Sequence, residues 1–356
     1  MRFLSAGEAS GDFFGAALLH HVQALDTQPC FGLGGPALRA AGQRQLANVL
    51  ERSAVGLSEN LVHVPYFQGL LQRMKAWLRQ CRPEVVILVD FQGFNLALGR
   101  YARSLGIPVV YFMAPQAWIW RSPGDLARIR ASCDLILSTF APEHAFYTQH
   151  GLPSRFVGHP LRSLLPPPNP HPAAQICWLP GSRAIEVKRL GPVIRALITH
   201  YAADNPAHTH VMPVAHPDLY APLRALFQDL PVTLIDSAYR YQALNNSQQV
   251  IGASGSAILE ALLLEKPTLA LYQVSSLTYQ LARRVLKSPW ITLPNLLLQA
   301  PIVPEFLQTF DSQAIIDCAT RLQPLDFKHA AAQLRPLLGE PNALEIAART
   351  LCEHVR

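Results

Sequence analysis

Short apolar runs alternate with longer amphipathic stretches along the whole chain. The run Val85–Val89 has five apolar residues in succession, which is typical of a parallel strand buried on both faces. The stretches between such runs predict helices, so the pattern predicts a parallel sheet covered by helices. In the first half of the chain, strands are expected at Arg2–Ala6, at the strand and turn Phe31–Pro36, and at Val85–Val89, Pro108–Met113, Asp134–Thr139 and Ser154–Val157.

The same alternation restarts after a proline-rich segment, Pro166–Pro172, in which five of seven residues are proline. Such a segment is stiff and extended, and it predicts a linker between two α/β domains. We expect a cleft at the carboxyl ends of the two sheets, where open α/β sheets bind ligands. The strands expected in the second half are residues 175–179, 209–213, 232–236, 249–252, 268–272 and 290–293. The predicted organisation is therefore an N-terminal domain (1–165), the linker (166–172), a C-terminal domain (173–325) and C-terminal helices (326–356) that either cross back or exchange with a partner copy.

Amino-acid composition restricts the classes of function that are compatible with the sequence. Half of the 356 residues are hydrophobic and the formal charge is +6, but only 15% of residues are charged. This composition argues against a nucleic-acid-binding protein and favours an anionic substrate or a membrane surface. Six scattered cysteines without a C-x-x-C pair indicate neither a zinc site nor a disulfide framework, and they fit the cytosol. We expect no signal peptide, and no transmembrane helix because no apolar run reaches about 18 residues.

The stretch Cys177–Val187 reads as a strand, a tight turn and a helix. The backbone N–H groups at the start of a helix favour an anion, and Gly181 allows a ligand to come close. Ser182 follows, and Arg183 adds a guanidinium that can hold phosphate oxygens. The hypothesis is a diphosphate site; the alternative is an ordinary turn with a solvated arginine.

A second strand, turn and helix spans Val250–Glu260 and contains Ser254, Gly255 and Ser256 in the turn. This turn also predicts an anion site, with hydroxyl groups in addition to backbone N–H groups. Glu260 lies one helical turn after Ser256, where a carboxylate can accept hydrogen bonds from both hydroxyls of a ribose. The alternative is a capped core helix on which Glu260 is a surface residue.

Two carboxylates in the first half follow predicted strands. Asp90 ends the run Val85–Val89 and is a candidate general base, the alternative being a helix-capping or turn residue. Glu8 lies in the glycine-rich turn Gly7–Asp12, which does not have the dinucleotide-binding G-x-G-x-x-G pattern. Glu8 would repel phosphate, so it suits a sugar hydroxyl or an acceptor; the alternative is an interaction with the helix dipole.

Three further features leave alternatives open. Trp118, Trp120 and Arg121 either line an acyl or sugar pocket or pack between domains. Residues 61–82 have an apolar, aromatic face edged by basic groups, which suits either an interfacial helix or a core helix of the sheet. Asn295 follows Pro294 in a predicted loop, where a nucleotide could supply its hydrogen-bond partners.

Together these motifs resemble the lipid-A-disaccharide synthase family, in family order over nearly the whole chain. One departure is that the family pattern Asp-x-Pro-Asp-Phe-Asn reads Asp90-Phe91-Gln92-Gly93-Phe94-Asn95 here, so a second carboxylate is missing. The matching stretches are Ala6–Asp12 (which includes Ser10), Gly34–Pro36, Val89–Asp90 with Phe94–Asn95, Trp118–Arg121, Phe156–His159, Leu179–Arg183, Ala253–Ala257 and Leu293–Leu296.

The resemblance implies a GT-B glycosyltransferase with two Rossmann-like parallel-sheet domains facing a central cleft. It implies inverting transfer from UDP-2,3-diacylglucosamine to 2,3-diacylglucosamine 1-phosphate (lipid X), without metal or cofactor, by a peripheral protein on the cytoplasmic face of the inner membrane of a Gram-negative cell. Either a monomer or a homodimer is compatible with it. The rival functions are a UDP-N-acetylglucosamine 2-epimerase-like enzyme and a non-catalytic lipid-binding protein. The family's roles map onto Asp90 and Arg183 as catalytic residues and onto Glu8, Ser10, Gly181, Ser182, Ser254, Gly255, Ser256, Glu260 and Asn295 as substrate-binding residues.

Overall fold

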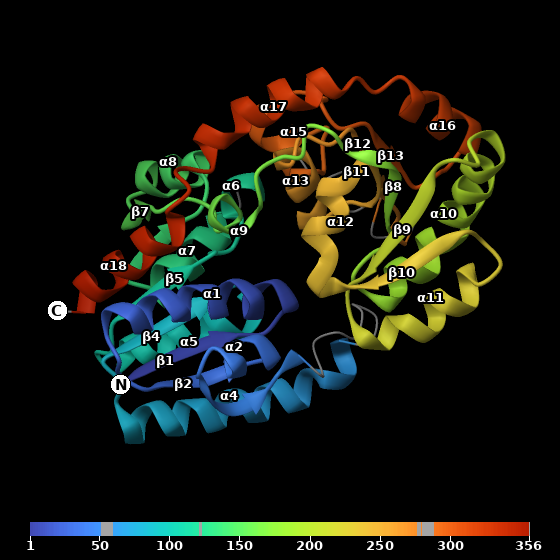
Figure 1. Cartoon of the computed structure of the whole chain (residues 1–356). Helices are drawn as coiled ribbons and strands as arrows, with labels where there is room; N and C mark the ends of the chain where they lie inside the picture. Colours follow the sequence, from blue (N-terminus) through green and yellow to red (C-terminus); the bar gives the residue numbers. More distant parts are fainter. Residues whose placement is uncertain (51–59, 121–122, 276–278, 280–287, 356) are drawn as a thin grey trace. The chain divides into compact units, whose positions relative to one another are not determined.

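The computed structural model describes residues 1–50, 60–120, 123–275, 279 and 288–355 of the chain. They form two compact units, each built on one parallel sheet (Figure 1). The first unit comprises Met1–Ser163 and Pro336–Arg356, and the second comprises Leu164–Arg335. The proline-rich segment therefore belongs to the second unit, and the predicted C-terminal segment 326–356 is divided between the two.

The first unit has a seven-stranded sheet of order β3-β2-β1-β4-β5-β6-β7, in which all paired strands are parallel. Its strands are β1 (Arg2–Ala6), β2 (Cys30–Gly34), β3 (Arg44–Asn48), β4 (Val85–Val89), β5 (Val109–Phe112), β6 (Leu135–Ser138) and β7 (Ser154–Phe156). The helices are α1 (Ala9–Leu25), α2 (Pro36–Ala40), α4 (Asn60–Cys81), α5 (Gln92–Ser104), α6 (Ala117–Trp120), α7 (Pro123–Ser132), α8 (Ala141–Gln149), α9 (Leu161–Leu164) and α18 (Ala343–Val355).

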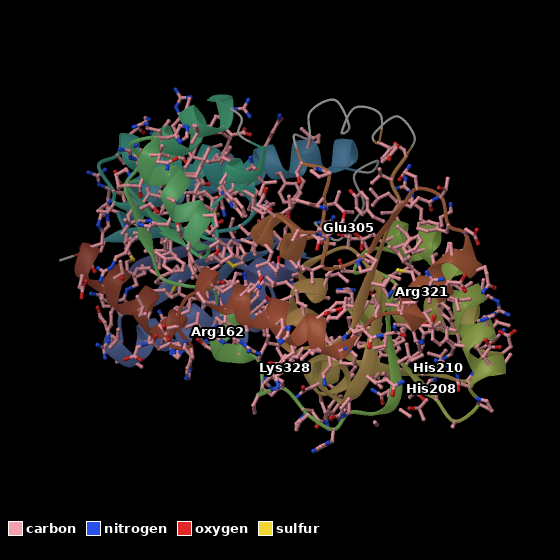
Figure 2. The ribbon with its side chains drawn as sticks, turned by 90° about the horizontal axis from the view of Figure 1, so that it is seen from above. Arg162, His208, His210, Glu305, Arg321 and Lys328 are labelled. Atoms are coloured by element: carbon pink, nitrogen blue, oxygen red, sulfur yellow. The ribbon has the colours of Figure 1, made fainter. Side chains whose placement is uncertain are left out.

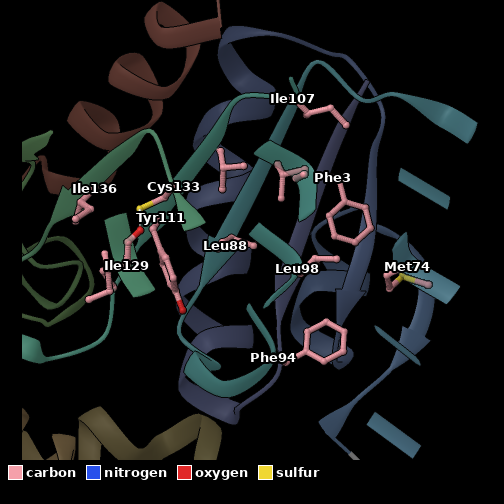
Figure 3. Close-up of a cluster of buried hydrophobic side chains, with 14 of the residues drawn as sticks. Phe3, Met74, Leu88, Phe94, Leu98, Ile107, Tyr111, Ile129, Cys133 and Ile136 are labelled. Carbon is pink, nitrogen blue, oxygen red and sulfur yellow. Dashed lines mark hydrogen bonds between the residues drawn. The ribbon is translucent and has the colours of Figure 1, made fainter. Parts of the chain in front are cut away.

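Helices α1 and α4 lie on opposite faces of this sheet (Figure 1). All five residues of β4 are buried, which confirms the strand predicted from its uninterrupted apolar run. On the α4 face, Phe3 of β1 and Leu88 of β4 pack with Met74 of α4 and Leu98 of α5 (Figure 3). On the α1 face, α18 packs along α1, so the last helix of the chain completes the first unit.

The second unit has a six-stranded parallel sheet of order β10-β9-β8-β11-β12-β13. In its main core, Ile176 and Trp178 of β8 pack with Leu190 and Ile194 of the long helix α10. The strands are β8 (Ala173–Leu179), β9 (Thr209–Val214), β10 (Val232–Asp236), β11 (Ser247–Ala253), β12 (Thr268–Tyr272) and β13 (Glu305–Leu307). The helices are α10 (Ala184–Asp204), α11 (Tyr220–Phe227), α12 (Arg240–Asn246), α13 (Ser256–Leu263), α15 (Leu293–Leu298), α16 (Ser312–Thr320) and α17 (Pro324–Leu337), with short 3₁₀ turns at Pro217–Leu219 and Ser237–Tyr239.

Two edge strands depart from the sequence-based expectation. The strand predicted at residues 290–293 is wrong: this stretch leads into α15, whose first turn contains Pro294, a residue that favours the start of a helix. The sixth strand of the second sheet is instead β13, which pairs with β12. In the first sheet, β3 was not expected because its sequence, RQLAN, is mostly polar. Both are edge strands, which need no continuous apolar run.

Hydrogen bonds tie the proline-rich segment to the second unit. The N–H of Asn169 donates to Asn245 Oδ1 at 2.8 Å, and Asn245 Nδ2 donates to the carbonyl of Pro167 at 2.9 Å. The buried Lys266 donates from Nζ to the carbonyl of Asn169 at 3.1 Å. The segment is thus anchored along its length by side chains of the unit to which it belongs.

Candidate active site

In the first unit, sheet register brings Asp90 to the glycine-rich turn that follows β1. β1 and β4 are parallel neighbours in which Ala6 pairs with Val89, so the residues after both strands meet at one edge. Ser10, in the first turn of α1, donates from Oγ to Asp90 Oδ2 at 3.2 Å. Two residues that are 80 positions apart in sequence therefore share one polar site.

The backbone at this site is strained. Asp90 and Phe91 have φ values of 49° and 51°, in the left-handed region that bulky residues rarely adopt. Two hydrogen bonds hold the carbonyl of Asp90 in this conformation, from Asn95 Nδ2 at 2.9 Å and from Tyr111 OH at 2.8 Å. Phe91 occupies the N-cap position of α5, so the structure excludes a helix-capping role for Asp90, whereas Asp90 does lie in the turn between β4 and α5.

Asn95 and Tyr111 hold the backbone of Asp90, a role that the sequence analysis did not assign to either residue. Asn95 is fully buried: its Oδ1 accepts from Ser5 Oγ at 2.7 Å, and its Nδ2 also donates to the carbonyl of Ser5 at 3.1 Å. Burial and the nearby charge of Asp90 raise the pKa of Tyr111 well above its usual value, so its hydroxyl remains a donor. The sequence held one indication of this hydrogen-bond network, because Ser5 in β1 and Tyr111 in β5 are hydroxyl-bearing residues within apolar runs. Figure 3 shows Tyr111 within the apolar core.

Phe91 explains the glycine at position 7. A Cβ on Gly7 would lie 2.3 Å from the Phe91 ring, so the turn after β1 tolerates only glycine while that ring keeps its place. The ring is held by stacking on Phe94, with centroids 5.2 Å apart, and by an edge contact with Phe67 of α4 at 5.6 Å. The aromatic contacts thereby fix the backbone from which Asp90 projects.

Glu8 lies at the N-cap position of α1 with an extended backbone. Its carbonyl accepts the N–H of Asp12 at 2.8 Å, and its side chain forms no capping hydrogen bond with the helix. Glu8 is half-buried and lies in the same turn as Ser10, at the carboxyl end of β1. This position is compatible with the predicted contact to an acceptor hydroxyl, which stays a prediction.

At the start of α10, a carboxylate of the protein occupies the predicted anion site. Glu186 Oε2 accepts the backbone N–H groups of Ser182 at 2.7 Å and of Arg183 at 3.2 Å. Gly181 has a φ of 121°, and a Cβ there would lie 2.4 Å from Glu186 Cβ. A diphosphate could not use these N–H groups unless Glu186 moved. Arg183 is 46% exposed, and its Nη1 lies 3.9 Å from Glu186 Oε1, so the guanidinium remains the group with which this turn can meet an anion.

The turn before α13 is arranged differently. The N–H of Ser254 donates to the carbonyl of Leu271 at 2.9 Å, which ties the turn to β12. Gly255 is the N-cap residue, and no atom lies within 4 Å of the place where its Cβ would be. Ser256 begins the helix. This N-terminus is exposed at Gly255 and Ser256, and the anion contact predicted for it stays a prediction.

Glu260 is not the surface residue of the alternative interpretation. Its side chain is 2% exposed, and its carboxylate is paired with Arg240 of α12. Arg240 Nε lies 3.0 Å from Glu260 Oε2, and Arg240 Nη2 donates to Glu260 Oε1 at 3.2 Å. The ribose contact predicted for Glu260 stays a prediction, and the structure adds a partner for its carboxylate, Arg240, that the sequence did not reveal.

Asn295 lies in α15 and not in a loop, and the protein itself satisfies its amide. Nδ2 donates to the carbonyl of Val303 at 2.8 Å and to Glu305 Oε1 at 2.9 Å, and Oδ1 accepts the N–H of Val303 at 2.9 Å. Glu305, labelled in Figure 2, is the first residue of β13. The need of Asn295 for partners therefore gives no argument for a nucleotide, and that contact rests on the resemblance alone.

Helix α4 buries one apolar face, while Val64 near its start is 43% exposed. Leu70, Met74 and Leu78 are buried against the first sheet, as the core-helix alternative proposed. Arg73 and Arg79 are exposed on the other side of the helix. Among the described helices, none is long and apolar enough to cross a membrane.

The aromatic stretch after β5 was expected as a loop, but its residues Ala117–Trp120 form the short helix α6. Trp118 packs against Phe140, with ring centroids 5.8 Å apart, inside the first unit. The side chain of Trp120 and the whole of Arg121 lie outside the described residues, as do the side chains of Leu61 and Val62.

Comparison with known proteins identifies relatives over almost the whole chain. A family model described as lipid-A-disaccharide synthetase matches residues 2–333. The lipid-A-disaccharide synthases of Pseudomonas paraeruginosa and Pseudomonas fluorescens are 36% and 38% identical to it, and each match covers 90% of this chain and 88% of the relative.

Solved structures share the fold at low sequence identity. The chain is similar to UDP-GlcNAc 2-epimerase from Neisseria meningitidis (TM-score 0.67, 15% identity, 99% of this chain and 100% of that one). It is also similar to CalG4, the calicheamicin glycosyltransferase (TM-score 0.62, 15% identity, 99% and 98%). The two parallel-sheet units have the GT-B fold.

Proposed function

Because the chain belongs to the lipid-A-disaccharide synthase family, we propose that it transfers 2,3-diacylglucosamine from UDP-2,3-diacylglucosamine to 2,3-diacylglucosamine 1-phosphate. The products are the β-1,6-linked disaccharide 1-phosphate and UDP. The observation that carries the proposal is the Asp90 site. A carboxylate lies at the carboxyl end of β4, on a strained backbone held by two hydrogen bonds, beside the hydroxyl of Ser10.

Asp90 is the proposed general base. The 6-hydroxyl oxygen of the acceptor attacks the anomeric carbon of the donor and transfers its proton to the Asp90 carboxylate. The bond between the anomeric carbon and the phosphate oxygen breaks in the same step, and UDP leaves with the electron pair. One displacement inverts an α-linked donor to a β-linked product. The hydrogen bond from Ser10 orients the carboxylate, and a positioned base of this kind contributes about 10²–10⁴-fold to rate.

The second unit provides the proposed donor site. The exposed guanidinium of Arg183 and the open N-terminus of α13 stabilise the charge that develops on the leaving diphosphate. Ser254, Gly255 and Ser256 line that N-terminus, and Glu260 accepts the ribose hydroxyls. Gly181 and Ser182 form the turn that positions Arg183. The carboxylate of Glu186 accepts the backbone N–H groups of Ser182 and Arg183. The proposal uses these groups alone for charge stabilisation and assigns no role to a cofactor.

Both proposed substrates carry fatty acyl chains, which remain in a bilayer. We therefore propose that the protein works on the cytoplasmic face of the inner membrane as a peripheral protein. Arg73 and Arg79 are exposed on α4 and are available to anionic lipid headgroups, and the exposed Val64 lies on the same helix.

A product assay tests the function against its two rivals. Purified protein is incubated with the acylated UDP-sugar and the acylated acceptor, and UDP and disaccharide are measured. Formation of both supports the proposal. Epimerised UDP-sugar without any need for acceptor would support an epimerase-like enzyme. Binding of the acylated sugars without turnover would support a lipid-binding protein.

A further inference from the structure

We propose that Arg240 is a positioning residue for the donor nucleotide, which holds Glu260 as an oriented carboxylate ready to accept ribose hydroxyls. The inference rests on the proposed function, because that proposal assigns Glu260 to the ribose. It adds a residue from a different element, α12, that neither the motifs nor the resemblance had singled out.

The geometry pairs one guanidinium with both oxygens of one carboxylate. Nε lies 3.0 Å from Oε2, and Nη2 lies 3.2 Å from Oε1. The Nη2–Oε1 contact is a hydrogen bond that orients the carboxylate, whereas Nε and Oε2 lie at ion-pair distance without the alignment of a hydrogen bond. Glu260 is 2% exposed and Arg240 is 30% exposed, so the arginine forms the outer side of the pair.

Tyr241 fixes the arginine in turn. Arg240 Nη2 donates to Tyr241 OH at 3.0 Å, and the guanidinium carbon lies 4.7 Å from the centroid of the Tyr241 ring. Burial and the charge of Glu260 raise the pKa of Tyr241 to about 12, so the phenol stays neutral and accepts this hydrogen bond. The carboxylate, the arginine and the tyrosine thus form one connected cluster between α12 and α13.

The electrostatic reason for the pair is the burial of Glu260. Burial raises the pKa of Glu260 and the charge of Arg240 lowers it, so removal of Arg240 would raise it further. Of the other elements packed on α13, β11 and α15 contain no titratable residue and β12 contains only Tyr272. Arg335 of α17 donates to the carbonyl of Leu263 at the end of α13, and its charge is paired with Glu265. A protonated carboxyl would present an O–H donor where the ribose hydroxyls need acceptors. Within the described part of the chain, Arg240 is the cation that keeps Glu260 able to accept.

The competing explanation is an ion pair that only holds α12 against α13. Loss of such a pair would lower stability, and it would weaken nucleotide binding by the same factor at every pH. The proposed role predicts a different result, because the loss of Arg240 also promotes protonation of Glu260 and the binding defect therefore grows as pH decreases. The pH dependence of UDP affinity therefore separates the two explanations.

The experiment measures the dissociation constant of UDP between pH 5 and 9 by calorimetry on the full-length protein and its variants. In Arg240→Gln, the loss of UDP affinity is expected to be smallest at high pH and to grow as pH decreases, with a midpoint about 1–3 pH units above that of the wild type. Arg240→Lys should restore most of the wild-type profile. Arg195→Gln is the matched control: it removes one arginine of the same unit from an exposed ion pair with Asp229 and should leave the profile unchanged.

Two further variants keep the inference separate from the proposed function. Glu260→Gln should bind UDP weakly at all pH values; normal binding by this variant would remove Glu260 from the ribose site and so overturn the proposed contact. In that case, the effect of Arg240 on the ionisation of Glu260 can still be measured without nucleotide, from the pH dependence of the unfolding free energy. The unfolding free energy of Arg240→Gln should decrease as pH rises through the raised pKa of Glu260, and the double variant Arg240→Gln/Glu260→Gln should lack this decrease. An Arg240→Gln protein whose UDP affinity and stability follow the wild-type pH profiles would overturn the inference.

Discussion

Ser10 Oγ donates a hydrogen bond to Asp90 Oδ2 at 3.2 Å, and this contact joins the turn after β1 to the end of β4. The two strands are neighbours in the sheet, so the contact follows from parallel pairing between Ala6 and Val89. Asn95 and Tyr111 hold the carbonyl of Asp90 on the side of the core. The backbone of Asp90 is thereby held on one side and its carboxylate on the other, which suits the proposed role of a positioned base.

Replacement of Asp90 by asparagine should abolish most turnover. The amide has nearly the same shape but cannot take a proton, so kcat should fall by about 10²–10⁴-fold while the affinity for UDP-sugar is retained. Steady-state kinetics and calorimetry measure the two quantities. Ser10→Ala, which removes only the orienting hydrogen bond, should lose much less activity. Near-normal kcat in Asp90→Asn would exclude this residue as the base.

A methyl group at Gly7 should destabilise the first unit. The added Cβ would lie 2.3 Å from the ring of Phe91, which is packed on Phe94 and cannot move freely. Overpacking of this kind costs about 1–3 kcal/mol, measurable by chemical denaturation. Gly93→Ala is the matched control, because no atom lies within 4 Å of its Cβ position. Equal stability of the two variants would show that Phe91 adjusts without cost.

Arg183→Ala should weaken UDP binding as well as turnover. Hydrogen bonds to charged groups contribute about 1.5–3 kcal/mol, which corresponds to about a 10- to 150-fold loss of UDP affinity. The loss should shrink as salt concentration rises, because Arg183 is largely exposed. Calorimetric titration with UDP at two ionic strengths measures both effects. Unchanged UDP affinity would count against a contact between Arg183 and the diphosphate.

Glu143 should make the stability of the protein depend on pH. Burial raises the pKa of this carboxyl to about 7, against 4.5 for an exposed glutamate, although the N–H groups of Thr139 and Phe140 partly oppose the rise. Between these pH values the folded protein keeps a proton that the unfolded chain has released. Stability should therefore fall as pH rises from about 4.5 to 7, by at most about 1.4 kcal/mol per pH unit, and become level above 7.

Glu143→Gln should remove this pH dependence, since the amide has no proton to lose. Glu340→Gln, on an exposed residue near the C-terminus, serves as the control and should keep the wild-type profile. Denaturant unfolding at a series of pH values makes the comparison. A Glu143→Gln profile that still declines between pH 4.5 and 7 would assign the effect to another group.

Charge reversal at Arg73 and Arg79 should reduce binding to anionic vesicles. Each basic residue near such a surface contributes about 1 kcal/mol, so reversal of two should weaken binding by an order of magnitude or more. Lys75 is left in place because its ammonium group lies 5.4 Å from the centroid of the Tyr101 ring. Reversal of the exposed Arg224 and Arg321 in the second unit is the control, and a vesicle co-sedimentation assay measures the change. If the two pairs have equal effects, α4 is not the membrane-facing surface.

The alternation of apolar runs and amphipathic stretches was sufficient to predict the α/β fold. Central strands such as β4 are buried on both faces, so each must be apolar throughout, and that requirement is visible in the sequence. The edge strands β3 and β13 carry no such requirement, and the first was missed while the second was placed at residues 290–293. Asp90 was identified correctly as a residue at the end of a buried strand, because parallel strands present their carboxyl ends at one edge.

Tertiary structure decided which polar groups meet at the sites. The sequence could not show that Glu186 fills the N-terminus of α10, that Asn295 is satisfied by Val303 and Glu305, or that Arg240 pairs with Glu260. A pattern of apolar positions records which residues leave water, because each buried apolar side chain contributes independently of its exact neighbour. A hydrogen bond or an ion pair depends on distances of about 3 Å between specific atoms, and those distances exist only once helices and strands from different parts of the chain have packed.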